Sequence, residues 1–242
     1  MALMDLTGKA YGVPCYQLAG GKFRDRIRCY SDTPTLHDPV EMGQKLKERM
    51  DSGFTFLKMD VGIGHLRGIS GTLSVPSGHL DNHNLMHPFT GIRITDKGLQ
   101  MLSEYVGAVR EIIGYEVPLA LDHFGHIGVE DCIRLARELD QYNLAWLEDM
   151  IPWQFTDQYV RLSNACTTPI CTGEDIYCKE EFVKLFEAKA IAISHPDIAT
   201  SGGILETKKI GDLAQEHGIV MAMHMAGTPI CAMASVHCAA AT

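Results

Sequence analysis

Residues 119–126 read LALDHFGH, a short apolar run that ends in an aspartate and two histidines. A run of this length beside polar residues is typical of a buried strand in a parallel sheet. Asp122 then stands at the carboxyl end of the strand, where α/β barrels gather their catalytic groups. The stretch therefore indicates an α/β protein with a polar site near Asp122.

The same alternation recurs along the chain. From about residue 27, short apolar runs alternate with longer amphipathic ones, which is the pattern of repeated βα units. We expect seven strands, at residues 26–32, 55–61, 117–123, 144–150, 169–175, 190–197 and 219–225.

Helix boundaries can also be predicted. Within 97–114, apolar residues recur at intervals of three and four, the spacing of one helix face. Asp38 and Thr95 precede helical patterns and are expected to begin helices. Glycines at positions 53, 114 and 218 are expected to end them.

Polar residues at the strand ends are regularly spaced. Glu148 follows Asp122 by 26 residues and Glu174 follows Glu148 by 26, while Asp197 and His224 come 23 and 27 residues further on. One polar group per βα unit favours a (β/α)8-type barrel, in which the strand ends meet at one mouth. A doubly wound sheet gives the same alternation, but its strand ends do not all converge.

Composition excludes several classes of partner. The 242 residues carry a formal charge of -9 and no basic stripe, so we expect no nucleic acid partner. No apolar run is long enough to span a membrane. The eight cysteines are scattered without a CxxC pair, which predicts reduced thiols in a cytoplasmic protein.

The predicted organisation is one barrel. Residues 1–26 are expected to form an entry segment, and residues 27–242 the (β/α) barrel domain. A long loop insertion at about 61–95 is predicted to be either a functional lid or a disordered insert. The insertion carries several histidines and arginines that could contact a substrate, namely His65, Arg67, His79, His83, His87 and Arg93.

Three strand-end acids form the candidate metal site. Asp122, Glu148 and Glu174 would repel one another in one mouth unless a cation neutralised them, and oxygen-only ligands suit Mg²⁺. Zinc is the weaker candidate, because the chain has neither HExxH nor a cysteine cluster. Taken singly, each acid could instead cap the helix that follows it.

Two further strand ends supply candidate catalytic groups. His224, with Asp197 one unit earlier, could act as a general base, whereas the alternative is a core histidine. Lys58 and Asp60 share one strand face. Lys58 could orient a substrate carboxylate or move a proton, and the alternative is an internal ion pair.

Several segments together resemble the mandelate racemase/muconate lactonizing enzyme-like branch of the enolase superfamily. They run through nearly the whole chain in one order: GKAYGVPCYQLAGG, LKMDVG, LALDHFGH, AWLEDM, CTGED, HPDIATSGGILE and AMHMAG. The resemblance implies Asp122, Glu148 and Glu174 as Mg²⁺ ligands and the pair His224–Asp197 as general base. It also implies a linker helix within residues 1–26, a small-molecule carboxylate substrate and a homo-oligomer. Such enzymes remove the proton next to a carboxylate, and the metal stabilises the enediolate.

Departures from the family pattern narrow the predicted reaction. Many relatives have a second lysine where this chain has Asp60, which makes a two-base racemase less favoured. Some acid-sugar dehydratases carry a histidine where this chain has Phe124, yet His123 or His126 could still donate a proton or contact hydroxyls. The chain also stops inside what is predicted as the seventh helix, without the last strand or the N-terminal capping domain of relatives.

The leading hypothesis is a Mg²⁺-dependent dehydratase that converts an aldonate or aldarate to a 2-keto-3-deoxy acid. The first alternative is an epimerase, racemase or cycloisomerase that uses Lys58 or a loop histidine as second base. The second alternative is a catalytically silent barrel fragment that serves in assembly or metal binding.

Overall fold

The computed structural model describes residues 1–76, 78, 90–122 and 125–242. It divides into two compact units: the middle unit, Cys29–Ile170, and the terminal unit, Met1–Arg28 together with Cys171–Thr242. Each is described by itself. In both, parallel strands alternate with helices, which confirms the predicted α/β class.

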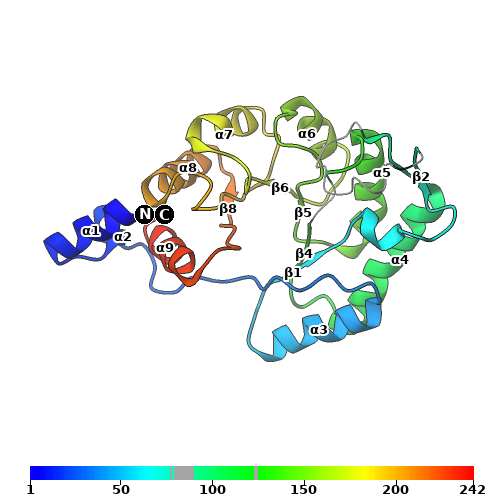
Figure 1. The fold of residues 1–242 in the computed structure, drawn as a ribbon, viewed down its shortest axis with the longest axis horizontal. Helices are drawn as coiled ribbons and strands as arrows, with labels where there is room; N and C mark the ends of the chain where they lie inside the picture. Colours follow the sequence, from blue (N-terminus) through cyan, green and yellow to red (C-terminus); the bar gives the residue numbers. More distant parts are fainter. Residues whose placement is uncertain (77, 79–89, 123–124) are drawn as a thin grey trace. The chain divides into compact units, whose positions relative to one another are not determined.

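The middle unit is built on the parallel strands β1, Leu57–Asp60, β4, Leu119–Asp122, and β5, Leu147–Glu148. Asp60 lies opposite Asp122, and Leu121 lies opposite Leu147. Helices cover the strands from outside (Figure 1). They are α3, Pro39–Asp51, α4, Asp96–Ile113, α5, Val129–Leu139, and α6, Thr156–Ser163, with 3-10 turns η1, Ile63–Leu66, and η4, Asp140–Tyr142.

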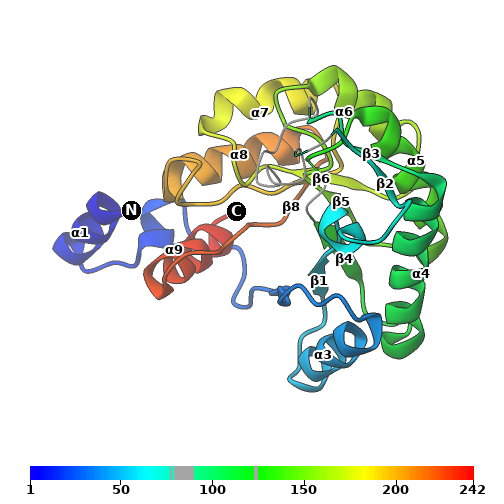
Figure 2. The same cartoon turned by 45° about the vertical axis from the view of Figure 1, so that its right-hand side comes forward.

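The terminal unit repeats this arrangement. Its parallel strands are β6, Ile170–Thr172, which begins at the last residue of the middle unit, β7, Ile193–Ser194, and β8, Val220–Met221. Its helices are α1, Ala2–Tyr11, α2, Cys15–Leu18, α7, Cys178–Glu187, α8, Ile204–Glu216, and α9, Pro229–Ala240. Helix α8 packs against both α7 and α9 (Figure 2). Helix α2 packs on α9.

Apolar side chains hold each unit together. In the middle unit Leu57, Met59, Leu119, Leu121 and Leu147 are fully buried along the strands. In the terminal unit a smaller core forms under α8 and α9, made of Ala19, Ile198, Ile204, Cys231, Ala234, Cys238 and Ala241. Burial of this apolar surface is the main favourable contribution to folding.

The predicted helix boundaries are confirmed. The Asp38 carboxylate accepts hydrogen bonds from the backbone N–H groups of Val40 and Glu41, and Thr95 accepts from Gly98. Gly114 is the C-cap of α4 at a φ of 70°. Gly53 and Gly218 follow the ends of α3 and α8 with φ of 94° and 68°.

The first predicted strand, at 26–32, is wrong for most of its length. Within this segment only Ser31 pairs, through a parallel bridge to Leu57. Its N–H donates to the carbonyl of Phe56, and Lys58 donates back to Ser31. Arg26, Arg28 and Cys29 are exposed, and a strand gains little stability from side chains that remain in solvent.

Two segments within the insertion predicted at about 61–95 form a short antiparallel pair that the sequence did not predict. Strand β2, Leu73–Ser74, pairs with β3, Arg93–Ile94. Residues 77 and 79–89, with His79, His83 and His87, lie outside the described residues. The alternatives of lid and disordered insert therefore stay open.

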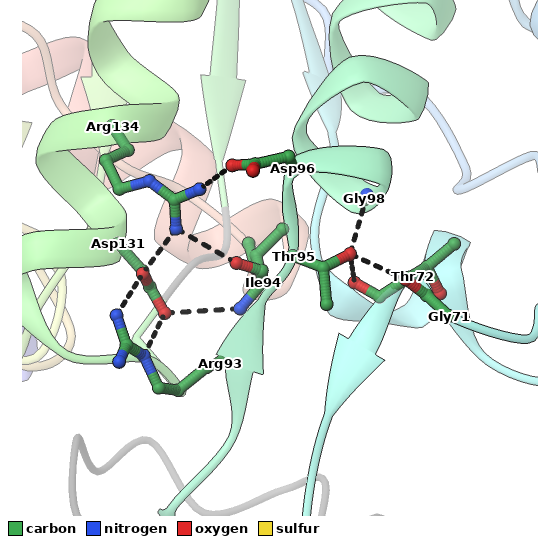
Figure 3. Close-up of polar contacts among 9 residues, drawn as sticks. All are labelled: Gly71, Thr72, Arg93, Ile94, Thr95, Asp96, Gly98, Asp131 and Arg134. Atoms are coloured by element: carbon green, nitrogen blue, oxygen red, sulfur yellow. Dashed lines mark hydrogen bonds and ion pairs between the residues drawn. The ribbon is translucent and has the colours of Figure 1, made fainter.

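Asp131 fastens β3 to helix α5 (Figure 3). Its buried carboxylate accepts hydrogen bonds from the Ile94 N–H at 3.2 Å and from Arg134 at 3.0 Å, and it pairs with Arg93 at 3.3 Å. Arg134 also donates to the Ile94 carbonyl and pairs with exposed Asp96.

Thr95 holds the other end of the insertion. Besides capping α4, its hydroxyl contacts the carbonyls of Gly71 and Thr72 at 2.7 and 3.0 Å (Figure 3). Thr95 thus joins the residues just before β2 to the start of α4, as Asp131 joins β3 to the start of α5.

Asp131→Asn is expected to destabilise the protein by about 1–3 kcal/mol, because an amide cannot accept all the hydrogen bonds that the buried carboxylate accepts. Urea unfolding measures the change. Asp96→Asn is the matched control, since Asp96 contacts the same Arg134 but its side chain is 97% exposed. If both variants unfold alike, the buried contacts of Asp131 do not contribute as described.

Among the described residues, no helix has both the length and the apolar character needed to cross a bilayer.

Candidate active site

Three charged residues of the middle unit meet at the strand ends. Lys58 on β1 places its Nζ 2.6 Å from Oδ2 of Asp122 and 2.7 Å from Oε1 of Glu148. All three side chains are at most 3% exposed. The parallel register aligns β1 with β4, so residues of neighbouring strands face one another here.

Two aromatic residues support this cluster. The indole Nε1–H of Trp146 donates to Oε2 of Glu148 at 2.7 Å. Trp146 and Glu148 stand two apart, which puts both side chains on one side of the extended chain. Lys58 Nζ lies 5.5 Å from the ring centroid of Tyr30, within range of a cation–π contact.

The cluster sets one cation against two carboxyl groups. Burial raises the pKa of Glu148 well above its usual value, and the nearby Asp122 carboxylate raises it further. Burial opposes the charged form of Lys58, but the Glu148 and Asp122 carboxylates outweigh it and raise the pKa of Lys58. Lys58 therefore stays positive, and the raised pKa of Glu148 shows that a second negative charge is disfavoured here without a further cation.

The donor set of the middle unit fits a hard divalent cation. Asp122, Glu148 and Asp149 each offer a carboxylate oxygen, and these atoms lie within 4.8 Å of one another. Oxygen ligands of this kind are those that Mg²⁺ prefers. Asp149 has a positive φ of 47°, an uncommon backbone conformation for a residue other than glycine.

The terminal unit brings together Glu174, Asp197 and His224. Asp197 and His224 form a parallel bridge beyond β7 and β8. The His224 Nδ1 lies 2.8 Å from Oδ2 of Asp197, and its Nε2 lies 3.1 Å from Oε2 of Glu174. Because an ionised carboxylate can only accept a hydrogen bond, Asp197 favours a proton on Nδ1 of His224, and Glu174 favours one on Nε2 in this arrangement.

His195 is a member of this cluster that the sequence interpretation missed. Its side chain is fully buried, and its ring meets the His224 ring edge to face with centroids 5.5 Å apart. His195 stands two residues before Asp197 in an extended segment, so strand alternation could have indicated it. The same spacing could have indicated Trp146.

The remaining predicted site residues make other contacts or lie outside the described residues. His123 is outside the described residues. The His126 carbonyl accepts a hydrogen bond from the Thr90 hydroxyl at 2.7 Å. Asp60 accepts one from Thr35 at 2.9 Å. Arg93 belongs to the Asp131 contacts rather than to either cluster.

A cleft of about 640 Å³ lies in the middle unit against η1 and α4. His65 and Tyr105 line it, with rings 4.7 Å apart, and Arg67 and Glu104 contribute charged groups. Both ring nitrogens of His65 are near backbone groups, Gly62 N–H and the Leu36 carbonyl. The cleft is lined by these residues and not by Lys58, Asp122 or Glu148.

Carboxylates and a histidine at the ends of parallel strands are typical of the polar site of an α/β domain of barrel type. The comparison with known proteins supports this class of domain. Residues 41–242 match the family described as Enolase C-terminal domain-like. The chain belongs to this family, which confirms the predicted enolase-superfamily resemblance.

A curated relative supports the predicted acid-sugar dehydratase branch of the superfamily. The chain is 36% identical over 250 residues to a D-xylonate dehydratase of Haloferax volcanii, covering 100% of this chain and 55% of the relative. The chain therefore spans about half the length of this relative.

Solved structures share the fold. A mandelate racemase/muconate lactonizing enzyme-like protein from Rubrobacter xylanophilus is 31% identical with a TM-score of 0.84, covering 99% of this chain and 60% of that one. The 3,6-anhydro-D-galactonate cycloisomerase from Zobellia galactanivorans is 29% identical with a TM-score of 0.77, covering 99% and 58%. The predicted barrel-type fold is thereby confirmed.

Proposed function

We propose that this protein is a Mg²⁺-dependent dehydratase of a sugar acid, an aldonate or aldarate. The observation that carries the proposal is the hydrogen-bonded pair His224–Asp197, with Nε2 of His224 facing Glu174. With Nδ1 held by Asp197, Nε2 is the ring nitrogen that would remove a proton at neutral pH once it is released from the Glu174 carboxylate. The similarity to a D-xylonate dehydratase supports the substrate class.

In the proposed reaction, Nε2 of His224 removes the proton from C2 of the acid. Asp197 holds the proton on Nδ1 and stabilises the imidazolium that forms. The C3 hydroxyl leaves as water after receiving a proton from a histidine, either His224 itself or His123 or His126. The resulting enol tautomerises to a 2-keto-3-deoxy acid.

Asp122, Glu148 and Glu174 would hold Mg²⁺, and the bound ion would offset the negative charge that develops on the substrate carboxylate. The joint role of these three acids is inferred from the pattern they share with the family. Lys58 would place a second positive charge beside the carboxylate, since it already binds two anionic groups.

The test is a screen of aldonates and aldarates with the purified protein and Mg²⁺. Release of a 2-keto acid, trapped with semicarbazide, is the expected result, and it should stop when the metal is chelated. If Mg²⁺ binds but no acid in the screen yields a 2-keto product, the dehydratase assignment is overturned.

The similarity to a cycloisomerase favours one alternative, an isomerase acting on a related acid. Lys58 or a loop histidine would then be the second base. Deuterium from heavy water appearing in recovered substrate, without 2-keto acid, would support it. A folded protein that binds Mg²⁺ and neither eliminates nor exchanges would instead support a silent barrel.

We further propose that the protein is cytoplasmic and forms a homo-oligomer. All eight cysteines lie among the described residues as free thiols, as suits a reducing compartment. Sedimentation analysis of the purified protein tests the oligomer.

A further inference from the structure

His195 contacts the imidazole that the proposed function uses as base. We propose that His195 is a positioning residue that fixes the ring plane of His224, an inference that rests on the proposed dehydratase function. The two rings lie with centroids 5.5 Å apart and planes inclined at 68°, an edge-to-face arrangement. Such pairs are preferred by the aromatic quadrupole.

The backbone of His195 is fixed against strand β6. Its N–H donates to the Thr172 carbonyl at 3.0 Å. A Cβ added at Gly173 would lie 2.8 Å from the carbonyl carbon of His195 and 2.9 Å from its nitrogen, and Gly173 has a φ of 152°. Glycine is thus required where the chain that leads to Glu174 passes His195.

The His224 ring needs more than one contact to hold its orientation. The contacts of Nδ1 with Asp197 and of Nε2 with Glu174 hold the two nitrogens but let the ring tilt about the line that joins them. The edge-to-face contact with the His195 ring opposes that tilt. It therefore fixes the plane of the His224 ring, and with it the direction of Nε2.

A different role for His195 would be simple space filling, because its side chain is fully buried. Space filling predicts a loss of stability on truncation with no specific change in the orientation of His224. Positioning predicts that a planar ring at this site preserves both the orientation and kcat. The two roles therefore differ in whether loss of the planar ring at position 195 turns the His224 ring.

The experiment compares His195→Ala with His195→Phe in the purified protein with Mg²⁺ and an acid that it dehydrates. We expect kcat to fall about tenfold in the alanine variant with KM within about twofold, because a misdirected base costs rate rather than binding. The phenylalanine variant should keep kcat within about threefold of wild type. His217→Ala is the matched control, since His217 contacts the Phe186 ring and does not contact His224 in the described residues.

A second readout does not depend on turnover. Crystal structures of the variants should show the His224 ring rotated in His195→Ala and unchanged in His195→Phe. A folded alanine variant with wild-type kcat and an unrotated ring would overturn the inference, as would a phenylalanine variant that loses the orientation. If the alanine variant does not fold, His195→Leu takes its place, because leucine fills the space without a planar ring and is then expected to show the rotated His224 ring. If wild type dehydrates no acid, the proposed function fails while the ring orientation still tests positioning.

Discussion

Replacing His224 with asparagine is expected to lower kcat for dehydration of a sugar acid by about 100- to 10,000-fold. Asparagine can still donate a hydrogen bond to Asp197 but cannot accept and carry the C2 proton. The two carboxylates beside this side chain, Asp197 and Glu174, keep a polar partner. We therefore expect the fold and Mg²⁺ binding to persist, as measured by unfolding and by calorimetric titration.

Asp197 and His224 should act as one unit. Asp197→Asn is expected to lower kcat about 100-fold or more. The amide N–H can donate to Nδ1 of His224 and so favour the tautomer that carries its proton on Nε2, and a neutral amide does not stabilise the imidazolium. The double variant should be no slower than His224→Asn alone, as is usual for residues that serve one step. Asp212→Asn is a matched control, because this exposed carboxylate of the terminal unit pairs only with Lys208 among its described contacts.

Three outcomes would contradict the assignment of His224. Turnover by His224→Asn within about tenfold of wild type would place the base elsewhere. Multiplicative losses in the double variant would mean that the two residues act independently. Loss of Mg²⁺ binding in His224→Asn would mean that the variant perturbs the metal site and not the proton transfer alone.

Much of this site could be predicted from the sequence because parallel strands end at a common edge. The acids at 122, 148 and 174 follow apolar runs at a constant spacing, so each was expected at a strand end. The caps at Asp38 and Thr95 were predictable for a similar reason, since a side-chain acceptor next to a helical pattern satisfies the free N–H groups.

The contacts between strands could not be predicted in the same way. Lys58 reaches Asp122 and Glu148 only because register brings β1, β4 and β5 together, and a sequence does not state its register. His195 and Trp146 lie in apolar segments where an aromatic ring is expected in the core. Their roles depend on which polar group lies beside them.

The Lys58 cluster gives the second large effect, this time on stability. Lys58→Met is expected to lower the free energy of unfolding of the metal-free protein by about 3–5 kcal/mol. Methionine fills a similar volume but leaves the buried Asp122 and Glu148 carboxylates without their cation, at 3% and 0% exposure. Urea unfolding in the presence of a chelator measures the change.

Lys45→Met is the matched control. Lys45 pairs with Glu48 at 2.6 Å, a distance equal to that between Lys58 and Asp122, but these side chains are 42% and 64% exposed. Because water screens an exposed ion pair, its loss is expected to cost no more than about 0.5 kcal/mol. Equal losses in the two variants would show that burial of the Lys58 cluster does not set its contribution.

Mg²⁺ should then stabilise Lys58→Met more than wild type. In wild type the Lys58 cation already lies against Asp122 and Glu148, whereas in the variant this cation is gone and a divalent ion can take its place. Because an ion that binds only the folded state raises its stability, Mg²⁺ titrated into both proteins should raise the midpoint of thermal unfolding further in the variant. An equal rise in both would mean that the ion does not bind at Asp122 and Glu148, and the proposed metal site would have to be sought elsewhere in the chain.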